Sequence, residues 1–428
     1  MEIESLLSKL IQIQSVNPPG GETEVARFLK HLFDEYQIPN EIIESAPGRG
    51  SFLAYLGEGE KSLLYLSHTD VVPASEGWSF NPFSGEINDG FIHGRGALDC
   101  KGLVAAEAFA VLQLASSTRL KGRLIFAATA DEEAGGTLGV QYLLENHKDK
   151  ITADFVVNEG GLAPLRVGDR TCHFTQIGEK GICWMNLKTS GSSAHGSLPM
   201  LGDNAVVKMA EVIDKLSKYQ PKVTLIPEVR QLVQEVTQLE GFDKDVNEDN
   251  VGEAIRRLSD RIFAGYLTAF TKMTVSPNVV HGGAKVNIVP DSCEAEVDIR
   301  VLPGQDKEYI VNELCHAIGN TVVEIIQYHA PTFSTADSDY YRLVVDTLQE
   351  SLGDAVLLPC ISSGASDSRF LRESGMPCYG IGIMTLNLDD NMKQSVHGKD
   401  EKIDIDSLKL KSDFLVRLAR KYLGEQVN

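Results

Sequence analysis

The chain has 428 residues, 43% of them hydrophobic and 23% charged, which excludes a disordered or fibrous protein and predicts two domains rather than one core. Forty basic and sixty acidic residues give a formal net charge of −20, which disfavours nucleic acid and membrane surfaces and leaves a small molecule as the expected partner. Seven scattered cysteines without a CxxC pair argue against a disulfide framework and a cysteine zinc site.

Helix and strand patterns alternate over the first part of the chain. Residues 1–16 have apolar positions at helical spacing and early acids where a secretion signal has basic residues. Since no later run is long enough to cross a membrane, we expect a cytoplasmic protein. Apolar runs of strand length at 62–72, 122–133 and 153–161 are separated by helical stretches such as 102–115. This alternation predicts an α/β fold with a mostly parallel sheet covered by helices.

A different pattern begins at about residue 178. Strands of alternating polarity at 181–191 and 287–303 and an amphipathic helix at 204–219 predict an inserted α+β domain. Within it, residues 227–272 form a charged helical segment that is longer than a compact lid needs. The predicted domains are therefore a first domain made of residues 1–177 and 332–428 and an inserted domain at 178–331.

Ionisable side chains follow each predicted strand of the first domain. His68 and Asp70 come after the first strand, two residues apart, so that the carboxylate could orient the imidazole. Glu132 and Glu133 come after the second strand and Glu159 after the third. Ligands of parallel sheets bind beyond the carboxyl ends of the strands, so we expect these side chains to converge.

Asp99 adds one more acid, in a glycine-rich turn just before a predicted helix. Several carboxylates gathered around one imidazole would repel each other unless a cation lay among them, which predicts a divalent metal. The donor types suit zinc, or manganese or cobalt, and the excess of carboxylates favours two ions. Asp99 is the natural bridge because it is the isolated acid of the set.

Three adjacent acids, Asp131, Glu132 and Glu133, follow the strand at 122–133. Neighbouring side chains at a strand end point in different directions, so one glutamate can bind metal while the other acts as general base. Asp131 is either a solvated loop charge or a partner behind the site, and the sequence does not choose between them.

Other chemistries have weaker support in the sequence. The chain has no Walker lysine motif, no HExxH and no GxSxG, and GRGALD lacks the third glycine of a dinucleotide fingerprint. Two alternatives stay open: a serine hydrolase that uses Ser362, Ser363 or Ser366, and a metal-binding or ligand-binding protein without turnover.

Motifs spread over nearly the whole chain resemble the dinuclear zinc metallopeptidases of clan MH. This family includes aminoacylase, carboxypeptidase S, acetylornithine deacetylase and succinyl-diaminopimelate desuccinylase. The matching motifs are SHTDVVPASEGW, GRGALDCKG, TADEEAGG, NEGG, GSSAHGSLP, HGGAKVNIVPD, VDIRVLPG, GASDSRF and SVHGKDEKI. The resemblance implies a zinc-peptidase catalytic domain and an inserted lid or dimerisation domain.

The resemblance also implies a ligand set for two metal ions. His68 and Glu159 would hold one ion, Glu133 and His397 would hold the other, and Asp99 would bridge them. The metals would be zinc, with cobalt or manganese as alternatives.

Further roles around the metals follow from the same resemblance. Asp70 would orient His68, and Glu132 would be the general base that takes a proton from the water bridging the metals and passes it to the leaving nitrogen. The peptide bond between Asp99 and Cys100 would be cis.

In the inserted domain the resemblance implies contacts with the substrate and a homodimer. His195 would reach into the partner's active site and stabilise the oxyanion, and Arg300 would pair with a substrate α-carboxylate. Asn287 and the backbone around Gly364 would be further substrate contacts.

The expected reaction is hydrolysis of an amide next to a free α-carboxylate, in an N-acyl amino acid or a short peptide. The motif NEGG is closer to the carboxypeptidase S and aminoacylase branch than to relatives with aspartate at this position. A biosynthetic deacylase of the acetylornithine or succinyl-diaminopimelate type is the alternative.

Overall fold

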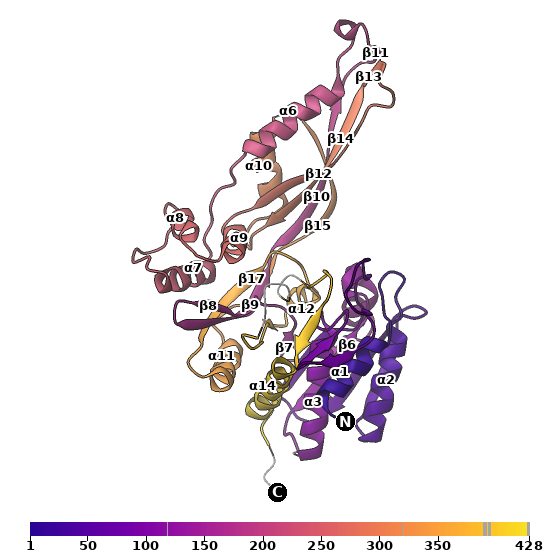
Figure 1. Cartoon of the computed structure of the whole chain (residues 1–428), viewed down its shortest axis with the longest axis vertical. Coiled ribbons are helices and arrows are strands. Elements are labelled where there is room, and N and C mark those ends of the chain that lie inside the picture. Colours follow the sequence, from indigo (N-terminus) through magenta and orange to yellow (C-terminus); the bar gives the residue numbers. More distant parts are fainter. Residues whose placement is uncertain (118, 320, 388–391, 393–394, 426–428) are drawn as a thin grey trace. The chain divides into compact units, whose positions relative to one another are not determined.

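The computed structural model describes residues 1–117, 119–319, 321–387, 392 and 395–425 (Figure 1). The chain divides into two compact units. The first contains residues 1–177, 334–360 and 366–428, and the second contains 178–333 and 361–365. Two short segments that the sequence assigned to the first domain therefore belong to the second unit. Thr332 and Phe333 pair there with Glu179 and Gly178, and the carbonyl of Ser362 accepts the amide of Lys180 at 2.9 Å.

The first unit is built around one sheet with helices packed against it. Its helices are α1 (Ile3–Gln12), α2 (Glu22–Glu35), α3 (Lys101–Ser117), α4 (Tyr142–Asn146), α5 (Lys148–Ile151), α11 (Asp339–Leu352), α12 (Ser368–Glu373) and α14 (Ile405–Leu423). Its strands are β1 (Asn40–Glu44), β2 (Gly50–Leu56), β3 (Ser62–His68), β4 (Glu86–Asn88), β5 (Phe91–His93), β6 (Arg123–Thr129), β7 (Phe155–Asn158), β8 (Leu165–Val167), β18 (Cys378–Ile381) and β19 (Lys402–Asp404). The strands β9 (Arg170–Glu179) and β17 (Val356–Ser362) continue into the second unit.

The middle of this sheet is parallel, and both flanks are antiparallel. The strand order is β1-β2-β6-β3-β7-β18-β9-β16, where β16 is Thr332–Phe333 of the second unit, with parallel pairing from β6 to β18. The predicted α/β class is thereby confirmed. His68 pairs with Thr129, and Tyr65 pairs with Val157, so the carboxyl ends of β3, β6 and β7 lie side by side. The loops that follow these strands therefore start from one edge of the sheet.

Apolar side chains bury both faces of the parallel strands. Every residue of β3 from Leu63 to His68 is buried, as expected for a parallel strand with helices on both sides. On one face, the rings of Phe33 on α2, Phe52 on β2 and Phe126 on β6 pack together, with centroids 5.1 to 5.9 Å apart. The strands that lead into the candidate site are thus anchored in a rigid core.

The second unit has its own sheet and its own core. Its helices are α6 (Ala205–Lys218), α7 (Pro227–Leu239), α8 (Val251–Arg256), α9 (Arg261–Phe270) and α10 (Lys307–Ile318). Its strands are β10 (Gly181–Ser190), β11 (Ala194–His195), β12 (Thr274–Gly282), β13 (Ile288–Val289), β14 (Ser292–Val301), β15 (Val322–His329) and β16 (Thr332–Phe333).

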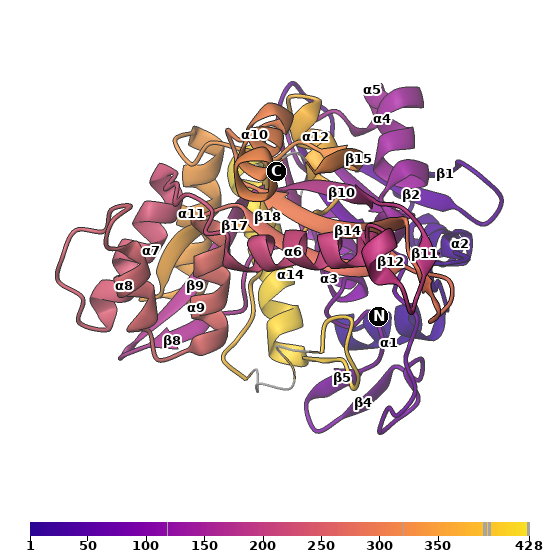
Figure 2. The same cartoon turned by 90° about the horizontal axis from the view of Figure 1, so that it is seen from above.

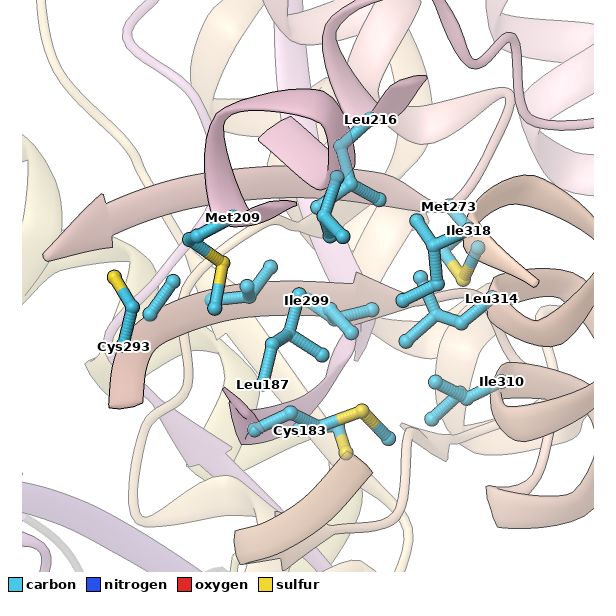
Figure 3. Close-up of a cluster of buried hydrophobic side chains, with 14 of the residues drawn as sticks. Cys183, Leu187, Met209, Leu216, Met273, Cys293, Ile299, Ile310, Leu314 and Ile318 are labelled. Carbon is cyan, nitrogen blue, oxygen red and sulfur yellow. The ribbon is translucent and has the colours of Figure 1, made fainter. Parts of the chain in front are cut away.

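Four of these strands form a sheet in the order β12-β14-β10-β15. Alternate residues of β14 are buried, as expected for a sheet with one covered face. The helix α6 lies along that face (Figure 2). Side chains of α6, α10, β10 and β14 point toward one another in the core between them (Figure 3).

The described helices include none that is both long and apolar enough to span a membrane. None of the seven cysteines, all of which the structure describes, forms a disulfide bond, and only Cys315 is exposed. The structure therefore agrees with the expectation that the cysteines form no disulfide framework.

Replacing Phe126 with alanine should lower the free energy of unfolding by about 3–5 kcal/mol, because it leaves a cavity among Phe33 and Phe52. Urea denaturation followed by circular dichroism measures this change. The control is Ile87→Ala at a position that is 45% exposed, where the change should stay within about 0.5 kcal/mol. Equal unfolding midpoints for the two variants would contradict the assignment of Phe126 to the core.

Candidate metal centre

The candidate donors come from five separate segments of the first unit. His68 is the last residue of β3, Asp99 comes just before α3, and Glu159 follows β7 directly. Glu133 lies on a single 3₁₀ turn, Glu132–Ala134, that follows β6, so the strand itself ends earlier than the sequence predicted. His397 lies in a turn with a positive φ of 56°.

One imidazole lies against two carboxylates at the end of β3. The Nε2 atom of His68 is 3.0 Å from Asp99 Oδ1 and 3.6 Å from Glu159 Oε1. His68 is buried, while Asp99 and Glu159 are only partly exposed. This is the trio that the resemblance assigned to the first metal ion.

A second imidazole lies on the other side of the same aspartate. The Nε2 atom of His397 is 3.1 Å from Asp99 Oδ2 and 3.1 Å from Glu133 Oε2. The two oxygens of Asp99 therefore face two different imidazoles. One carboxylate joins both clusters, which is the arrangement a bridging ligand needs.

The state of the donor atoms fits metal ions at both positions. The Nδ1 atom of His68 lies 2.9 Å from the backbone carbonyl of Asp70, so a proton on Nδ1 leaves the lone pair of Nε2 for a metal. Glu133 Oε1 is buried and has no hydrogen-bond partner among the described residues. A buried carboxylate oxygen without a partner is costly, and a cation would satisfy it. The donors could thus hold two divalent ions, and imidazole with carboxylate suits zinc, manganese or cobalt.

The pKa values in the cluster show an excess of negative charge, because the acidic groups raise the pKa of both imidazoles. Hydrogen bonds to Asp99 and Glu133 raise the pKa of His397 to about 10. Burial alone would lower the pKa of His68, yet the acidic groups around it raise that pKa well above its usual value. Burial raises the pKa of Glu159, whereas the two imidazoles lower that of Asp99. Since a metal ion must displace the imidazole protons, its affinity should increase as the pH rises.

Glu132 occupies a position suited to proton transfer. Desolvation raises the pKa of its carboxyl well above the usual value, and the negative charges of Glu159, Asp367 and Asp99 add to the effect. A raised pKa brings a carboxyl closer to the range in which it can both accept and donate a proton. Asp367, whose own pKa burial raises to about 7, was not predicted from the sequence.

Asp70 acts mainly through groups other than the one expected. Its carboxylate oxygen lies 3.5 Å from His68 Nδ1, farther than its own backbone carbonyl. The carboxylate instead accepts the backbone amides of Glu132 at 3.2 Å and Glu133 at 3.0 Å. Asp70 thereby connects the loop after β3 with the turn after β6.

Glu401 is a residue of the site that the sequence did not reveal. Its carboxylate accepts the amides of Leu98 at 2.7 Å, Asp99 at 3.1 Å and Gly96 at 3.1 Å. The same carboxylate also forms an ion pair with the guanidinium of Arg95, at 2.6 Å. Glu401 therefore fixes the backbone from which Asp99 projects. The motif SVHGKDEKI contains it, but a contact across 302 residues leaves no local signal.

The peptide bond between Asp99 and Cys100 is cis, as the resemblance implied. The Cys100 side chain is buried, and the amide of His68 lies 3.2 Å from its sulfur. Asp99 thus lies next to the strand that presents His68.

The predicted substrate contacts all belong to the second unit, whereas all five metal donors belong to the first. His195 and Asn287 lie on adjoining chain segments, since β11 pairs with β13 and the amide of Gly196 donates to the carbonyl of Asn287. Both are exposed. Gly364 is also exposed, and its amide donates to Ser362 Oγ at 3.0 Å.

Arg300 is already engaged by a neighbour on its own strand. Its Nε and a terminal nitrogen donate to the two carboxylate oxygens of Asp298, at 2.8 and 3.1 Å. The sequence did not predict this ion pair. A carboxylate ligand would therefore meet a guanidinium whose charge is partly balanced.

Comparison with known proteins bears directly on this site. The profile of peptidase family M20/M25/M40 matches residues 64–421. A probable succinyl-diaminopimelate desuccinylase of Staphylococcus aureus is 25% identical over 421 residues, with 92% of this chain and 93% of that protein covered. A probable carboxypeptidase S-like protein of Dictyostelium discoideum is 28% identical over 389 residues, with 86% and 73% covered.

The fold has a counterpart among solved structures. The crystal structure of an M20 family metallo-carboxypeptidase from Sulfolobus solfataricus matches with a TM-score of 0.72 and 22% identity, over 98% of this chain and all of that one. The family profile extends from β3 into α14 and includes all five metal donors of the site. The resemblance seen in the sequence is confirmed: the chain belongs to peptidase family M20/M25/M40 and is a metallohydrolase.

Proposed function

We propose that the chain hydrolyses an amide bond next to a free α-carboxylate, in an N-acyl amino acid or a short peptide, with two divalent metal ions. The observation that carries the proposal is the carboxylate of Asp99, whose two oxygens face the imidazoles of His68 and His397. Zinc is the proposed metal, with cobalt and manganese as alternatives.

Each residue of the site has a role in this reaction. Bound metal ions would polarise the scissile carbonyl and make water a stronger nucleophile near neutral pH. Glu132 accepts the proton of the attacking water and delivers it to the leaving nitrogen, which its raised pKa favours. Asp70 holds the backbone of Glu132 and Glu133 in place through two amide hydrogen bonds.

Two residues of the second unit have proposed chemical roles toward the substrate. The amide of Ser197 donates to His195 Nδ1 at 3.2 Å, which leaves Nε2 to carry a proton toward an oxyanion. Arg300 keeps donors that Asp298 does not use, and these would bind the substrate carboxylate. Asn287 and Gly364 complete the proposed set.

A biosynthetic deacylase is the second candidate. The match to a probable succinyl-diaminopimelate desuccinylase over 92% of the chain favours it, whereas the carboxypeptidase S-like relative favours the first. A hydrolysis panel separates the two: N-acetyl and long-chain N-acyl amino acids, dipeptides, N-acetylornithine and N-succinyl-diaminopimelate, each with zinc, cobalt or manganese. Preference for either of the last two substrates would replace the first proposal with the second.

A homodimer is proposed as well, because apolar side chains are exposed at one end of the second unit. They lie on β12, on β13, at the start of α6, in the segment 198–201 after β11 and in the loop before β13. Figure 1 shows the course of these elements. The exposed residues are Leu198, Met200, Leu201, Val206, Val207, Val280, Val286 and Ile288. A patch of this kind is typical of an interface.

Replacing Glu132 with glutamine should leave both metal ions bound while turnover falls by several orders of magnitude, because the base is lost and every donor is kept. The matched control is Glu133→Gln, which should lose one metal ion together with activity. Metal content by mass spectrometry and kcat on the best panel substrate are the two measurements. Near-normal turnover of Glu132→Gln would place the base elsewhere.

Removal of metal with a chelator should abolish hydrolysis, and zinc, cobalt or manganese should restore it. The reason is that, in the proposed reaction, the attacking water depends on the metal ions for its activation. Activity is measured after dialysis and again after addition of each ion. Activity that survives complete removal would favour the serine alternative at Ser362, Ser363 or Ser366.

The double substitution Leu201→Asp and Val286→Asp should convert a dimer into a monomer, because it places charges in the proposed interface. Analytical ultracentrifugation reports the mass, and metal content should not change. The control is Val322→Asp, which is 60% exposed on β15, outside the patch. A wild-type chain that sediments as a monomer would refute the dimer.

A further inference from the structure

Five buried polar side chains of the first unit form one hydrogen-bonded network next to the candidate metal centre. None is more than 7% exposed. The members are Asn17, Glu22, Arg49, Asp70 and Asp131. Three of them are acidic and one is basic, so the guanidinium of Arg49 is the single positive charge among these five side chains.

Arg49 lies at the centre of this network. One terminal nitrogen donates to Asn17 Oδ1 at 3.1 Å and to the carbonyl of Pro19 at 3.0 Å. The other donates to a carboxylate oxygen of Asp131 and forms an ion pair with Glu22 Oε1 at 2.9 Å. Four oxygen atoms thus surround the planar guanidinium of Arg49. A lysine ammonium cannot reproduce this geometry.

The turn NPPGG leaves room for this side chain. Gly20 has a φ of +98°, and a Cβ built on it would lie 2.1 Å from a terminal nitrogen of Arg49. Only glycine fits at a position with this conformation and this neighbour. The turn therefore makes room for the guanidinium, in addition to separating α1 from α2.

A chain of hydrogen bonds connects Arg49 to the proposed base and to a proposed metal ligand. Asn17 accepts from Arg49 and donates its Nδ2 to Asp70 Oδ2 at 2.8 Å. Asp70 then accepts the backbone amides of Glu132 and Glu133. Arg49 itself contacts neither of these two glutamates in the hydrogen bonds described above.

Asp131 forms a second connection to the same turn. One of its carboxylate oxygens accepts from Arg49, and the other accepts the amide of Leu138 at 2.7 Å. Its own amide donates to Glu22 Oε1 at 3.2 Å. Asp131 has a φ of +74°, a conformation that is unfavourable for a non-glycine residue and that these contacts hold in place.

We propose that Arg49 is a positioning residue for the metal centre. It holds Asn17 and Asp131 so that the turn Glu132–Ala134 presents the base and the ligand in the correct directions. This inference rests on the proposed function, since it concerns the same Glu132 and Glu133.

The test compares Arg49→Gln, Arg49→Lys and a control that affects stability alone. Phe414→Leu is the control, because Phe414 is buried on α14 and is not part of the network. Each metal-free protein is titrated with zinc by calorimetry, under conditions where circular dichroism shows it folded. The kcat of each zinc-loaded protein is measured on the best panel substrate.

Arg49→Gln should weaken binding of one of the two zinc ions by about 10- to 100-fold and lower kcat by a similar factor, as is usual when a partner behind a ligand is removed. Arg49→Lys should have the same effects to a smaller degree. If the glutamine variant does not fold, the lysine variant tests whether Arg49 positions the metal centre. Phe414→Leu should lower the unfolding midpoint while zinc affinity and kcat stay at the wild-type level.

Two results would overturn the inference. A folded Arg49 variant with wild-type affinity for both zinc ions and wild-type kcat would show that Arg49 serves stability alone. In a double-mutant cycle of Arg49→Gln with Asp131→Asn, effects on zinc affinity that simply add would show that the two residues do not act together. A wild-type protein that binds fewer than two zinc ions would instead refute the dinuclear function itself, and the inference with it.

Discussion

The crowding of carboxylates at one edge of the parallel sheet is the constraint on which the rest of this structure depends. Glu133 and Glu159 gather there because β6 and β7 end beside β3, and Asp99 lies 3.0 Å from His68 at the end of β3. Buried like charges cannot remain together without a compensating cation. The two imidazoles supply that charge when protonated, which explains the raised pKa values of His68 and His397. Metal ions would supply it more completely and free the imidazoles to act as ligands.

Two loops of the site share one means of support. Each is held by a buried carboxylate that accepts backbone amides instead of binding metal itself. Glu401 does this for the loop before α3, and Asp70 does it for the turn after β6. Backbone amides fix the direction in which neighbouring side chains project, without adding a side chain that competes for the metal. Some acids of this region, namely Glu401 and Asp70, therefore support the backbone and are not candidate metal ligands.

The sequence predicts which candidate donors come together but not the residues that support them, for a physical reason. The convergence of His68 and Glu159 could be predicted because continuous apolar runs of strand length locate strand ends, and ligands collect beyond such ends. Arg49 could not, because its contact with Asp131 joins residues 82 positions apart and leaves no local pattern. The sequence allows two interpretations of Asp131, and the structure places it in the buried network.

The limits of local pattern also explain the differences in the second unit. Residues 361–365 follow an α/β-like pattern, yet they pack with the second unit because a long-range contact to Lys180 holds them there. Arg300 fits a carboxylate-binding motif, but Asp298 lies two residues away on the same face of β14 and occupies part of its fork. A motif specifies residue types in order, whereas the ion pairs between them depend on the direction of each side chain.

The division of the chain into two units separates two properties of the proposed enzyme. All five candidate metal donors, and the carboxylates that support them, belong to the first unit, so metal affinity is set by the packing of that unit. The proposed oxyanion and carboxylate contacts belong to the second unit, so they can change without any change in the metal ligands. Substrate preference can therefore diverge between proteins that keep the same metal chemistry. This is why a site with a well-defined donor set does not by itself decide between an N-acyl amino acid and a succinylated diamino acid as substrate.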